Sequence, residues 1–207
     1  MISSQILYNI EKLILNINVN FYRKNFRFFM KSIIQSQGIH HITLNGSNKK
    51  TSVDFWQNVL GMKLIFEQPN LDDLSINHLY FDCGDGRTIT VFTDEKRKSK
   101  KLNNNNQPGS VHHIAIWVSQ STIRIAEKNL NENKISNTGI KDRGFMDSLY
   151  FKEPLGLLVE LASYKFEPPQ GRSYADVLEN AHKIRLKRKA LNIQDQDIAM
   201  AIKYLSK

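Results

Sequence analysis

The sequence predicts an α+β fold in which two βαβββ modules form one curved mixed sheet, with helices at the C-terminal end. Three repeated features lead to this prediction. The motif His-His-Ile occurs at residues 40–42 and again at 112–114, and Leu-Tyr-Phe occurs at 79–81 and 149–151. Gly86 matches Gly156 at the same spacing as the Leu-Tyr-Phe motifs. Landmarks that keep almost one register indicate that a single structural unit occurs twice in the chain.

The first unit reads as a strand, a helix and three more strands. A strand is predicted at 40–44 and a helix at 48–61. In this helix Val53, Trp56 and Leu60 recur at spacings of three and four, which is typical of one apolar helix face. The remaining strands are predicted at 62–68, 77–83 and 87–93, with a turn at 82–86.

The second unit repeats this order. A strand is predicted at 111–118 and a helix at 121–133, with Ile123, Ala126 and Leu130 on one face. The strands that follow are predicted at 134–139, 148–153 and 157–163, with a turn at 153–156. One or two terminal helices, packing on the modules, are predicted within 173–207.

These elements divide the chain into five expected segments, which are an N-terminal extension (1–35), module one (36–95), a basic polar linker (96–110), module two (111–165) and a C-terminal helical extension (166–207). The apolar and basic N-terminal segment has too many polar interruptions for a transmembrane helix. Three interpretations stay open: a peripheral amphipathic helix, an organelle-targeting peptide, or translation upstream of a true start at Met30. The last is slightly favoured.

Charge and cysteine content limit the classes of function. The formal net charge is +9, and residues 1–31 and 96–101 together account for the whole excess. The basic character therefore belongs to appendages, and we expect neither nucleic-acid binding nor an integral membrane segment. A single cysteine, Cys83, excludes an internal disulfide framework and suits a reducing compartment. We expect a cytoplasmic protein, or an organellar one if residues 1–30 are a genuine presequence.

Strand alternation sorts the histidines between the two faces of the predicted sheet, because neighbours in a strand point to opposite faces. His40 shares a face with Ile42, and His112 shares one with Ile114, so these faces should meet the helices. His41 and His113 then point toward the inner face of the sheet. Leu157, Val159 and Leu161 form the aliphatic face of the last strand, which turns Glu160 inward as well.

Two imidazoles and one carboxylate form the facial triad of non-haem Fe(II) oxygenases. His41, His113 and Glu160 are therefore candidate metal ligands. Each could instead be structural, as a hydrogen-bonded strand histidine or an ion-paired glutamate. The three together, on equivalent strands of a repeat, favour a metal, because a buried carboxylate without a cation is costly.

With these residues in place, the chain resembles the vicinal oxygen chelate superfamily, which includes glyoxalase I, bleomycin-resistance proteins and extradiol dioxygenases. The resemblance covers residues 36–165 and rests on the repeated His-His-Ile, the βαβββ order and the stretch at 149–162. That stretch is similar to the extradiol signature at six positions, Leu149, Tyr150, Glu153, Pro154, Gly156 and Glu160.

Two departures narrow the resemblance. Extradiol catechol enzymes carry a histidine several residues before the Leu-Tyr pair, where this chain has Arg143. Thr90 is the module-one counterpart of Glu160, where glyoxalase I carries a fourth, carboxylate ligand. The chain is more similar to ring-cleaving dioxygenases of para-hydroquinones. That resemblance implies Fe(II) at the metal site, with Mn(II), Zn(II), Ni(II) or Co(II) as alternatives, and catalytic roles for five residues, His40, Thr43, His112, Arg143 and Tyr150.

The expected function is therefore an Fe(II)-dependent, extradiol-type ring-cleaving dioxygenase of a hydroquinone- or catechol-like aromatic. Its expected partners are a small aromatic substrate and O2. The alternative is a metal-dependent lyase or isomerase of the glyoxalase or epimerase type, and a third interpretation is a binding protein without catalysis. The sequence is compatible both with a cup that the two modules of one chain form together and with a homodimer. His78 and Tyr80 are expected to line the cup without taking part.

Overall fold

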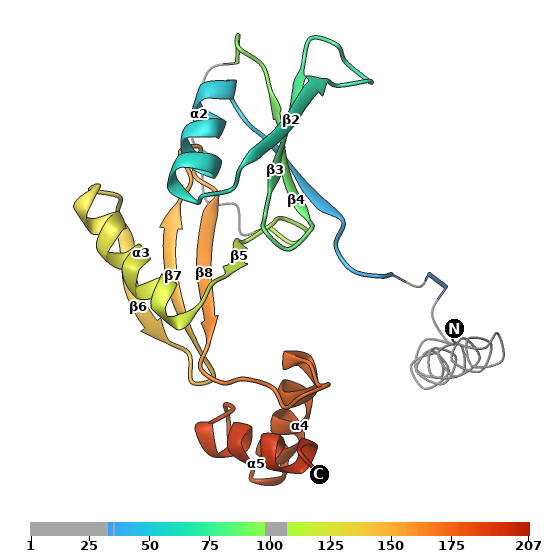
Figure 1. Ribbon diagram of the computed structural model, residues 1–207, viewed down its shortest axis with the longest axis vertical. Coiled ribbons are helices and arrows are strands. Elements are labelled where there is room, and N and C mark those ends of the chain that lie inside the picture. Colours follow the sequence, from blue (N-terminus) through green and yellow to red (C-terminus); the bar gives the residue numbers. More distant parts are fainter. Residues whose placement is uncertain (1–32, 35, 98–106) are drawn as a thin grey trace, which may run out of the picture. The chain divides into compact units, whose positions relative to one another are not determined.

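The computed structural model describes residues 33–34, 36–97 and 107–207, coloured by sequence in Figure 1. It divides the chain into two units, one ending at Ile42 and one running from Thr43 to the C-terminus. The predictions for the N-terminal extension at 1–32 and for the middle of the linker at 98–106 lie outside the described residues. Among the helices that are described, none is both long and apolar enough to cross a membrane.

Module one contains a four-stranded sheet in the order β1-β4-β3-β2. Its strands are β1 (His41–Asn45), β2 (Leu64–Pro69), β3 (Asn77–Asp82) and β4 (Thr88–Thr93). Helix α2 (Lys49–Val53) is capped by Asn48, whose side chain accepts a hydrogen bond from the Thr51 backbone N–H. The order of the elements is the predicted one.

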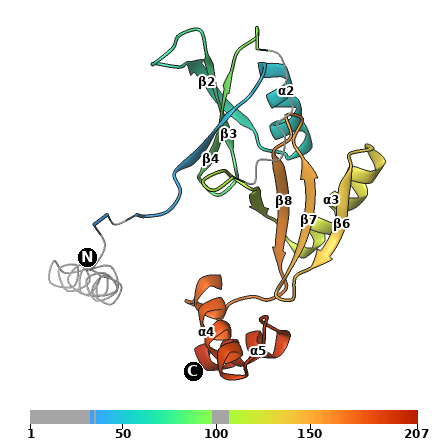
Figure 2. The ribbon, with the colours of Figure 1, turned by 180° about the vertical axis from the view of Figure 1, so that it is seen from behind.

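Module two repeats this arrangement as a second four-stranded sheet, in the order β5-β8-β7-β6. Its strands are β5 (Ile114–Trp117), β6 (Asn137–Asp142), β7 (Met146–Lys152) and β8 (Leu158–Tyr164). Strand β5 pairs with β8 in parallel, and the other pairs are antiparallel. Helix α3 (Gln120–Glu132) lies along the sheet, as Figures 1 and 2 both show.

The α+β fold class is confirmed, but the expectation of one continuous curved sheet is wrong in one respect. The hydrogen-bonded strands of the described residues form two separate four-stranded sheets. In each module the strand before the helix joins a three-stranded antiparallel meander. A repeat in the sequence predicts the content of each module, whereas edge-to-edge pairing of the two depends on contacts between distant segments.

The helix of module one also differs from the prediction. After α2 the chain continues as a π-helical segment, η1 (Asp54–Val59), in which the Leu60 N–H bonds to the Phe55 carbonyl five residues back. The wider turn buries the adjacent side chains of Phe55 and Trp56, which are 4% and 1% exposed. Val53 and Leu60 stay only half-buried. A pattern counted at the α-helical period therefore identified Trp56 and missed Phe55.

Equivalent positions of the two modules carry buried side chains. Leu79 and Phe81 of β3 are buried, and so are their counterparts in β7, Leu149 and Phe151. In the helix of module two, Ile123 and Leu130 are buried as expected, and Ala126 is half-buried. Each sheet therefore buries one face against its own helix and leaves the other face for polar side chains.

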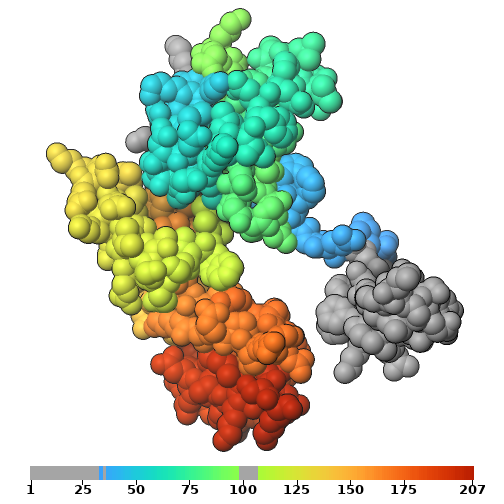
Figure 3. Space-filling model, viewed as in Figure 1, coloured from blue at the N-terminus to red at the C-terminus, as the bar shows by residue number. Residues whose placement is uncertain are grey.

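Two helices form the C-terminal extension, α4 (Tyr174–Lys187) and α5 (Asp195–Leu205). They pack on each other around Val177, Ala181, Ile198 and Ala201. Their side chains form one continuous mass in the space-filling view (Figure 3). The predicted packing on the modules is made by aromatic rings, because Tyr174 stacks on Tyr164 of β8 with ring centroids 4.2 Å apart.

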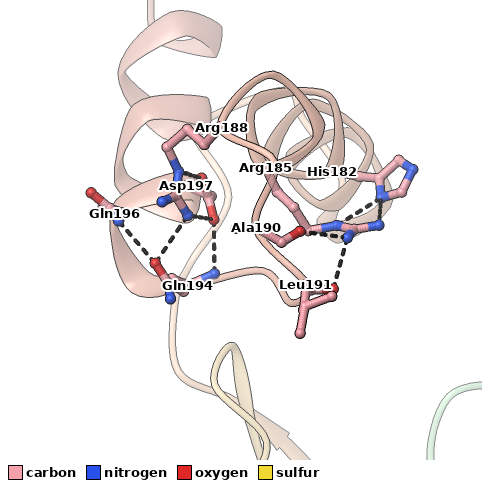
Figure 4. Close-up of polar contacts among 8 residues, drawn as sticks. All are labelled: His182, Arg185, Arg188, Ala190, Leu191, Gln194, Gln196 and Asp197. Carbon is pink, nitrogen blue, oxygen red and sulfur yellow. Dashed lines mark hydrogen bonds and ion pairs between the residues drawn. The ribbon is translucent and has the colours of Figure 1, made fainter.

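A buried ion pair joins the two helices. Asp197, whose side chain is fully buried, receives hydrogen bonds at 2.8 and 2.7 Å from the Arg188 guanidinium. The same carboxylate accepts the backbone N–H of Gln194 at the start of α5. Nearby, Arg185 donates to the carbonyls of Ala190 and Leu191, as Figure 4 shows. The loop between the helices is therefore held by Arg185 of α4 and by Arg188, the residue that follows its last turn.

Candidate metal centre

Three of the predicted site residues of module two meet on one face of its sheet. Nε2 of His113 lies 2.9 Å from Oε2 of Glu160, and the Tyr150 hydroxyl donates to Oε1 of the same carboxylate, also at 2.9 Å. Glu160 is only 3% exposed. A buried carboxylate is costly unless it is paired and hydrogen-bonded, and these two contacts are the pairing that Glu160 has in this structure.

The strand register explains this convergence. Glu160 of β8 is the direct partner of Tyr150 on β7 and of Ala115 on β5. His113 precedes Ala115 by two residues and therefore shares its face. The predicted strand at 111–118 is shorter than expected, because β5 begins only at Ile114. His112 and His113 therefore lie just before the strand, where His112 is exposed and His113 is half-buried.

The two histidine doublets have nearly the same geometry. Nδ1 of His112 lies 2.7 Å from Nδ1 of His113, and the rings are at 80° to each other. In the unit that ends at Ile42, Nδ1 of His40 lies 2.8 Å from Nδ1 of His41, with the rings at 81°. A histidine that binds a metal commonly uses its second ring nitrogen in a hydrogen bond, which fixes the orientation of the ring.

Arg143 lies at the edge of the same site. Its guanidinium carbon is 5.6 Å from the centre of the Tyr150 ring, within the range of a cation–π interaction. The tight turn between β6 and β7 places it there, since the Arg143 N–H bonds to the Met146 carbonyl and Gly144 adopts a φ of 83°. A side chain at Gly144 would also approach the Ile193 carbonyl to 3.1 Å.

The donor set of module two fits a divalent transition metal. One imidazole nitrogen and one buried carboxylate oxygen converge, and Nδ1 of the imidazole is held by His112. Within the described residues, no group of three or more His, Cys, Asp or Glu side chains gathers into a metal site. The metal-binding role of His41, His113 and Glu160 therefore stays a prediction, as do the catalytic roles of the other five residues.

A second polar cluster occupies the sheet of module one and joins Thr43, a predicted catalytic residue, to His78, Tyr80 and Thr90, for which the sequence predicted no catalytic role. His78 of β3 lies 2.8 Å from the Thr90 hydroxyl through Nε2 and 3.0 Å from the Tyr80 hydroxyl through Nδ1. The Thr90 hydroxyl in turn donates to the Thr43 hydroxyl at 2.8 Å. Period-two alternation places His78 and Tyr80 on one face, and this was the signal available in the sequence.

Two cavities lie away from the cluster of His113, Glu160 and Tyr150, although Thr43 lines the second of them. One, of about 380 Å³, is lined by residues of η1 and α3 with Phe151 and Leu161. The other, of about 490 Å³, lies between β1, Trp56 and the turn at 153–157. His113, Glu160 and Tyr150 line neither of them. Chemistry rather than cavity size therefore identifies the candidate centre.

Replacing Tyr150 with phenylalanine is expected to lower the free energy of unfolding by about 1–2 kcal/mol, because a buried carboxylate oxygen loses its hydroxyl donor. Urea denaturation measures the change. Tyr174→Phe is the matched control, since the Tyr174 hydroxyl donates to Glu167, whose carboxylate is exposed and can turn to water instead. Equal losses in the two variants would contradict a special role for the buried pair.

The chain is similar to a known protein family and to curated relatives. Residues 38–161 match the model of the Glyoxalase/Bleomycin resistance protein/Dioxygenase superfamily. The chain is 29% identical over 129 residues to "Putative ring-cleaving dioxygenase MhqO" of Bacillus subtilis (strain 168), a match that covers 61% of this chain and 40% of that protein. A second relative from the same strain, MhqA, carries the same description and is 24% identical over 123 residues, which are 58% of this chain and 38% of the relative. The chain thus spans about two fifths of the curated relatives that it matches.

Solved structures agree on the fold. A structure described as a "putative dioxygenase from Bacillus subtilis subsp. subtilis str. 168" superposes with a TM-score of 0.54 at 27% identity, over 66% of this chain and 43% of that one. A glyoxylase/bleomycin resistance protein/dioxygenase domain from Frankia sp. EAN1pec superposes with a TM-score of 0.55 at 15% identity, over 67% of this chain and 96% of the domain. The likeness at 15% identity concerns the fold alone.

Proposed function

Starting from the Glyoxalase/Bleomycin resistance protein/Dioxygenase superfamily, to which this chain belongs, we propose that the protein is an extradiol-type, ring-cleaving dioxygenase of a hydroquinone- or catechol-like aromatic. The observation that carries the proposal is the contact of His113 with the buried carboxylate of Glu160, which the Tyr150 hydroxyl also contacts. The descriptions of the two Bacillus subtilis relatives support the same class of reaction.

The metal in this proposal is Fe(II), held by His41, His113 and Glu160. Fe(II), when bound, supplies the one-electron chemistry that allows O2 to react with an aromatic ring. Thr90 supports iron over the metals of a glyoxalase-type lyase, because it stands where such a lyase carries a further carboxylate ligand. A threonine hydroxyl adds no negative charge to the site, so the site keeps the positive charge that favours a deprotonated phenol.

The surrounding residues bind the substrate and move its protons. His112 is the proposed acceptor of the phenolic proton, which it can take up once its Nδ1 leaves the hydrogen bond with Nδ1 of His113, and His40 has the equivalent place beside His41. Arg143 and the Tyr150 hydroxyl stabilise the negative charge that develops on the substrate oxygen. Thr43 donates a hydrogen bond to the bound aromatic.

The proposal is tested by loading the full chain with Fe(II) under anaerobic conditions, measuring its metal content, and then following O2 uptake with a panel of hydroquinones and catechols. We expect stoichiometric iron and substrate-dependent O2 consumption. Bound Zn or Ni without O2 uptake would favour the lyase or isomerase, and absence of any metal would favour a binding protein. The solution mass of the loaded protein distinguishes a single-chain site from a homodimer.

A further inference from the structure

The polar cluster of module one is a continuous chain of hydrogen bonds across three strands. It runs from Tyr80 through His78 on β3 and Thr90 on β4 to Thr43 on β1, with each link between 2.8 and 3.0 Å. Thr90 is fully buried, whereas Thr43 is exposed. These hydrogen bonds therefore connect the buried Thr90 hydroxyl to the exposed Thr43 hydroxyl on the open face of the sheet.

The hydrogen bonds of this cluster all run in one direction, from donor to acceptor. Thr90 uses its single hydroxyl proton toward Thr43, so its oxygen can only accept from His78. Nε2 of His78 must then carry a proton, and in the neutral ring Nδ1 is the acceptor. The Tyr80 hydroxyl is the group that donates to that nitrogen. Every proton thus points toward Thr43, whose own hydroxyl proton is not used within the chain.

Aromatic rings line the same face. The ring of Phe66 stacks on Tyr80 with centroids 4.0 Å apart, and Phe92 packs on His78 at 4.4 Å. The register pairs Tyr80 with both Phe66 and Thr90, so these side chains share a face across three strands. A flat ligand on this face meets π surfaces together with one oriented hydroxyl donor.

We propose that Tyr80, His78 and Thr90 are positioning residues, which hold the Thr43 hydroxyl as a donor toward an oxygen of an aromatic ligand on the module-one sheet. The ligand class is a phenol or phenolate. The inference rests on the proposed function for the identity of the ligand only. The direction of the hydrogen bonds follows from this chain of four residues.

The experiment measures anaerobic binding of hydroquinone to the full, iron-loaded chain by calorimetry, at equal iron content in all variants. Thr43→Val is expected to weaken binding about tenfold, because it removes the donor to a charged oxygen, and Thr43→Ser is expected to restore it. Tyr80→Phe and Thr90→Val are expected to weaken binding about threefold, since the donor stays but loses its orientation. Thr88 lies on the same face of β4 but takes no part in the chain of hydrogen bonds, so Thr88→Val should bind hydroquinone as the wild type does.

A second measurement reports the direction itself. In the metal-free full chain labelled with 15N-histidine, the ring of His78 is expected as the Nε2–H tautomer, with His78→Gln used to assign its signals. Tyr80→Phe should shift this ring toward a mixture of tautomers, a change that lost packing alone would not produce.

Three results would overturn the inference. The first is an Nδ1–H tautomer of His78 in the wild type, which reverses the direction of the hydrogen bonds. The second is wild-type hydroquinone affinity in Tyr80→Phe and Thr90→Val. The third is no binding of hydroquinone by the wild type. Failure of the proposed function is distinguished from these, because it would appear as absent O2 uptake while binding and its dependence on Thr43 persist.

Discussion

Glu160→Gln is expected to lower the affinity for the metal by at least about 100-fold and to abolish O2 uptake. Changes to residues that merely support a ligand already cost 10- to 100-fold, and this substitution removes the charge of the ligand itself. The amide keeps the shape of the side chain and can still accept the Tyr150 hydroxyl, so the sheet should stay folded. Metal content after dialysis, with circular dichroism of the same samples, measures the effect.

Glu153→Gln is the matched control for this prediction. Glu153 is also a buried glutamate of module two, at 8% exposure, and burial raises the pKa of its carboxyl. Its carboxylate accepts the Leu155 N–H in the turn after β7 and is not in contact with His113. The control should retain metal. Full metal content in Glu160→Gln would remove Glu160 from the ligand set and, with it, the proposed centre.

Asp197→Ala is expected to destabilise the C-terminal helix pair by about 2–3 kcal/mol. The substitution removes a fully buried carboxylate that accepts two hydrogen bonds from Arg188 and one from the start of α5. Hydrogen exchange should become faster throughout α5. The control is Asp195→Ala in the first turn of the same helix, where the acid acts on the helix dipole and should contribute only a few tenths of a kcal/mol.

The ion pair between Arg188 and Asp197 also makes the stability of the C-terminal helix pair depend on pH. The hydrogen bonds from Arg188 lower the pKa of Asp197, although burial alone would raise it. A carboxyl whose pKa is lowered by folding contributes stability above its unfolded pKa of about 4, and that stability is lost as the pH falls through the folded pKa. The protection of the α5 amides, measured relative to their intrinsic exchange rate at each pH, should therefore fall in acid, below about pH 4. Asp197→Asn should remove this dependence, and an unchanged acid profile in that variant would assign it to another group.

The repeat could be predicted from the sequence because it is recorded in local patterns. The period-two alternation around Glu160 and the doublets at His41 and His113 identify faces of strands without reference to any other segment. The same pattern predicts that His113 and Glu160 point to one side of the sheet, and the structure adds their direct contact. The residues of module two were therefore predicted as a group, and the structure brings them together.

Other features depend on contacts that no local pattern records. The π-helical turn buries Phe55 beside Trp56, and a count at the α-helical period cannot anticipate it. His78 was expected only to line the cup, because its bond to Thr90 exists only in the register of β3 with β4.

By itself, the sequence determined the two modules, the family, and the side chains of module two that face inward, since each follows from short-range periodicity and the spacing of a repeat. Only the tertiary structure decided that the strands form two separate sheets, and that Tyr80, His78 and Thr90 form a chain of hydrogen bonds leading to Thr43. The physical reason is that hydrogen bonds between strands depend on register, and register is set by the packing of residues that are distant in the chain.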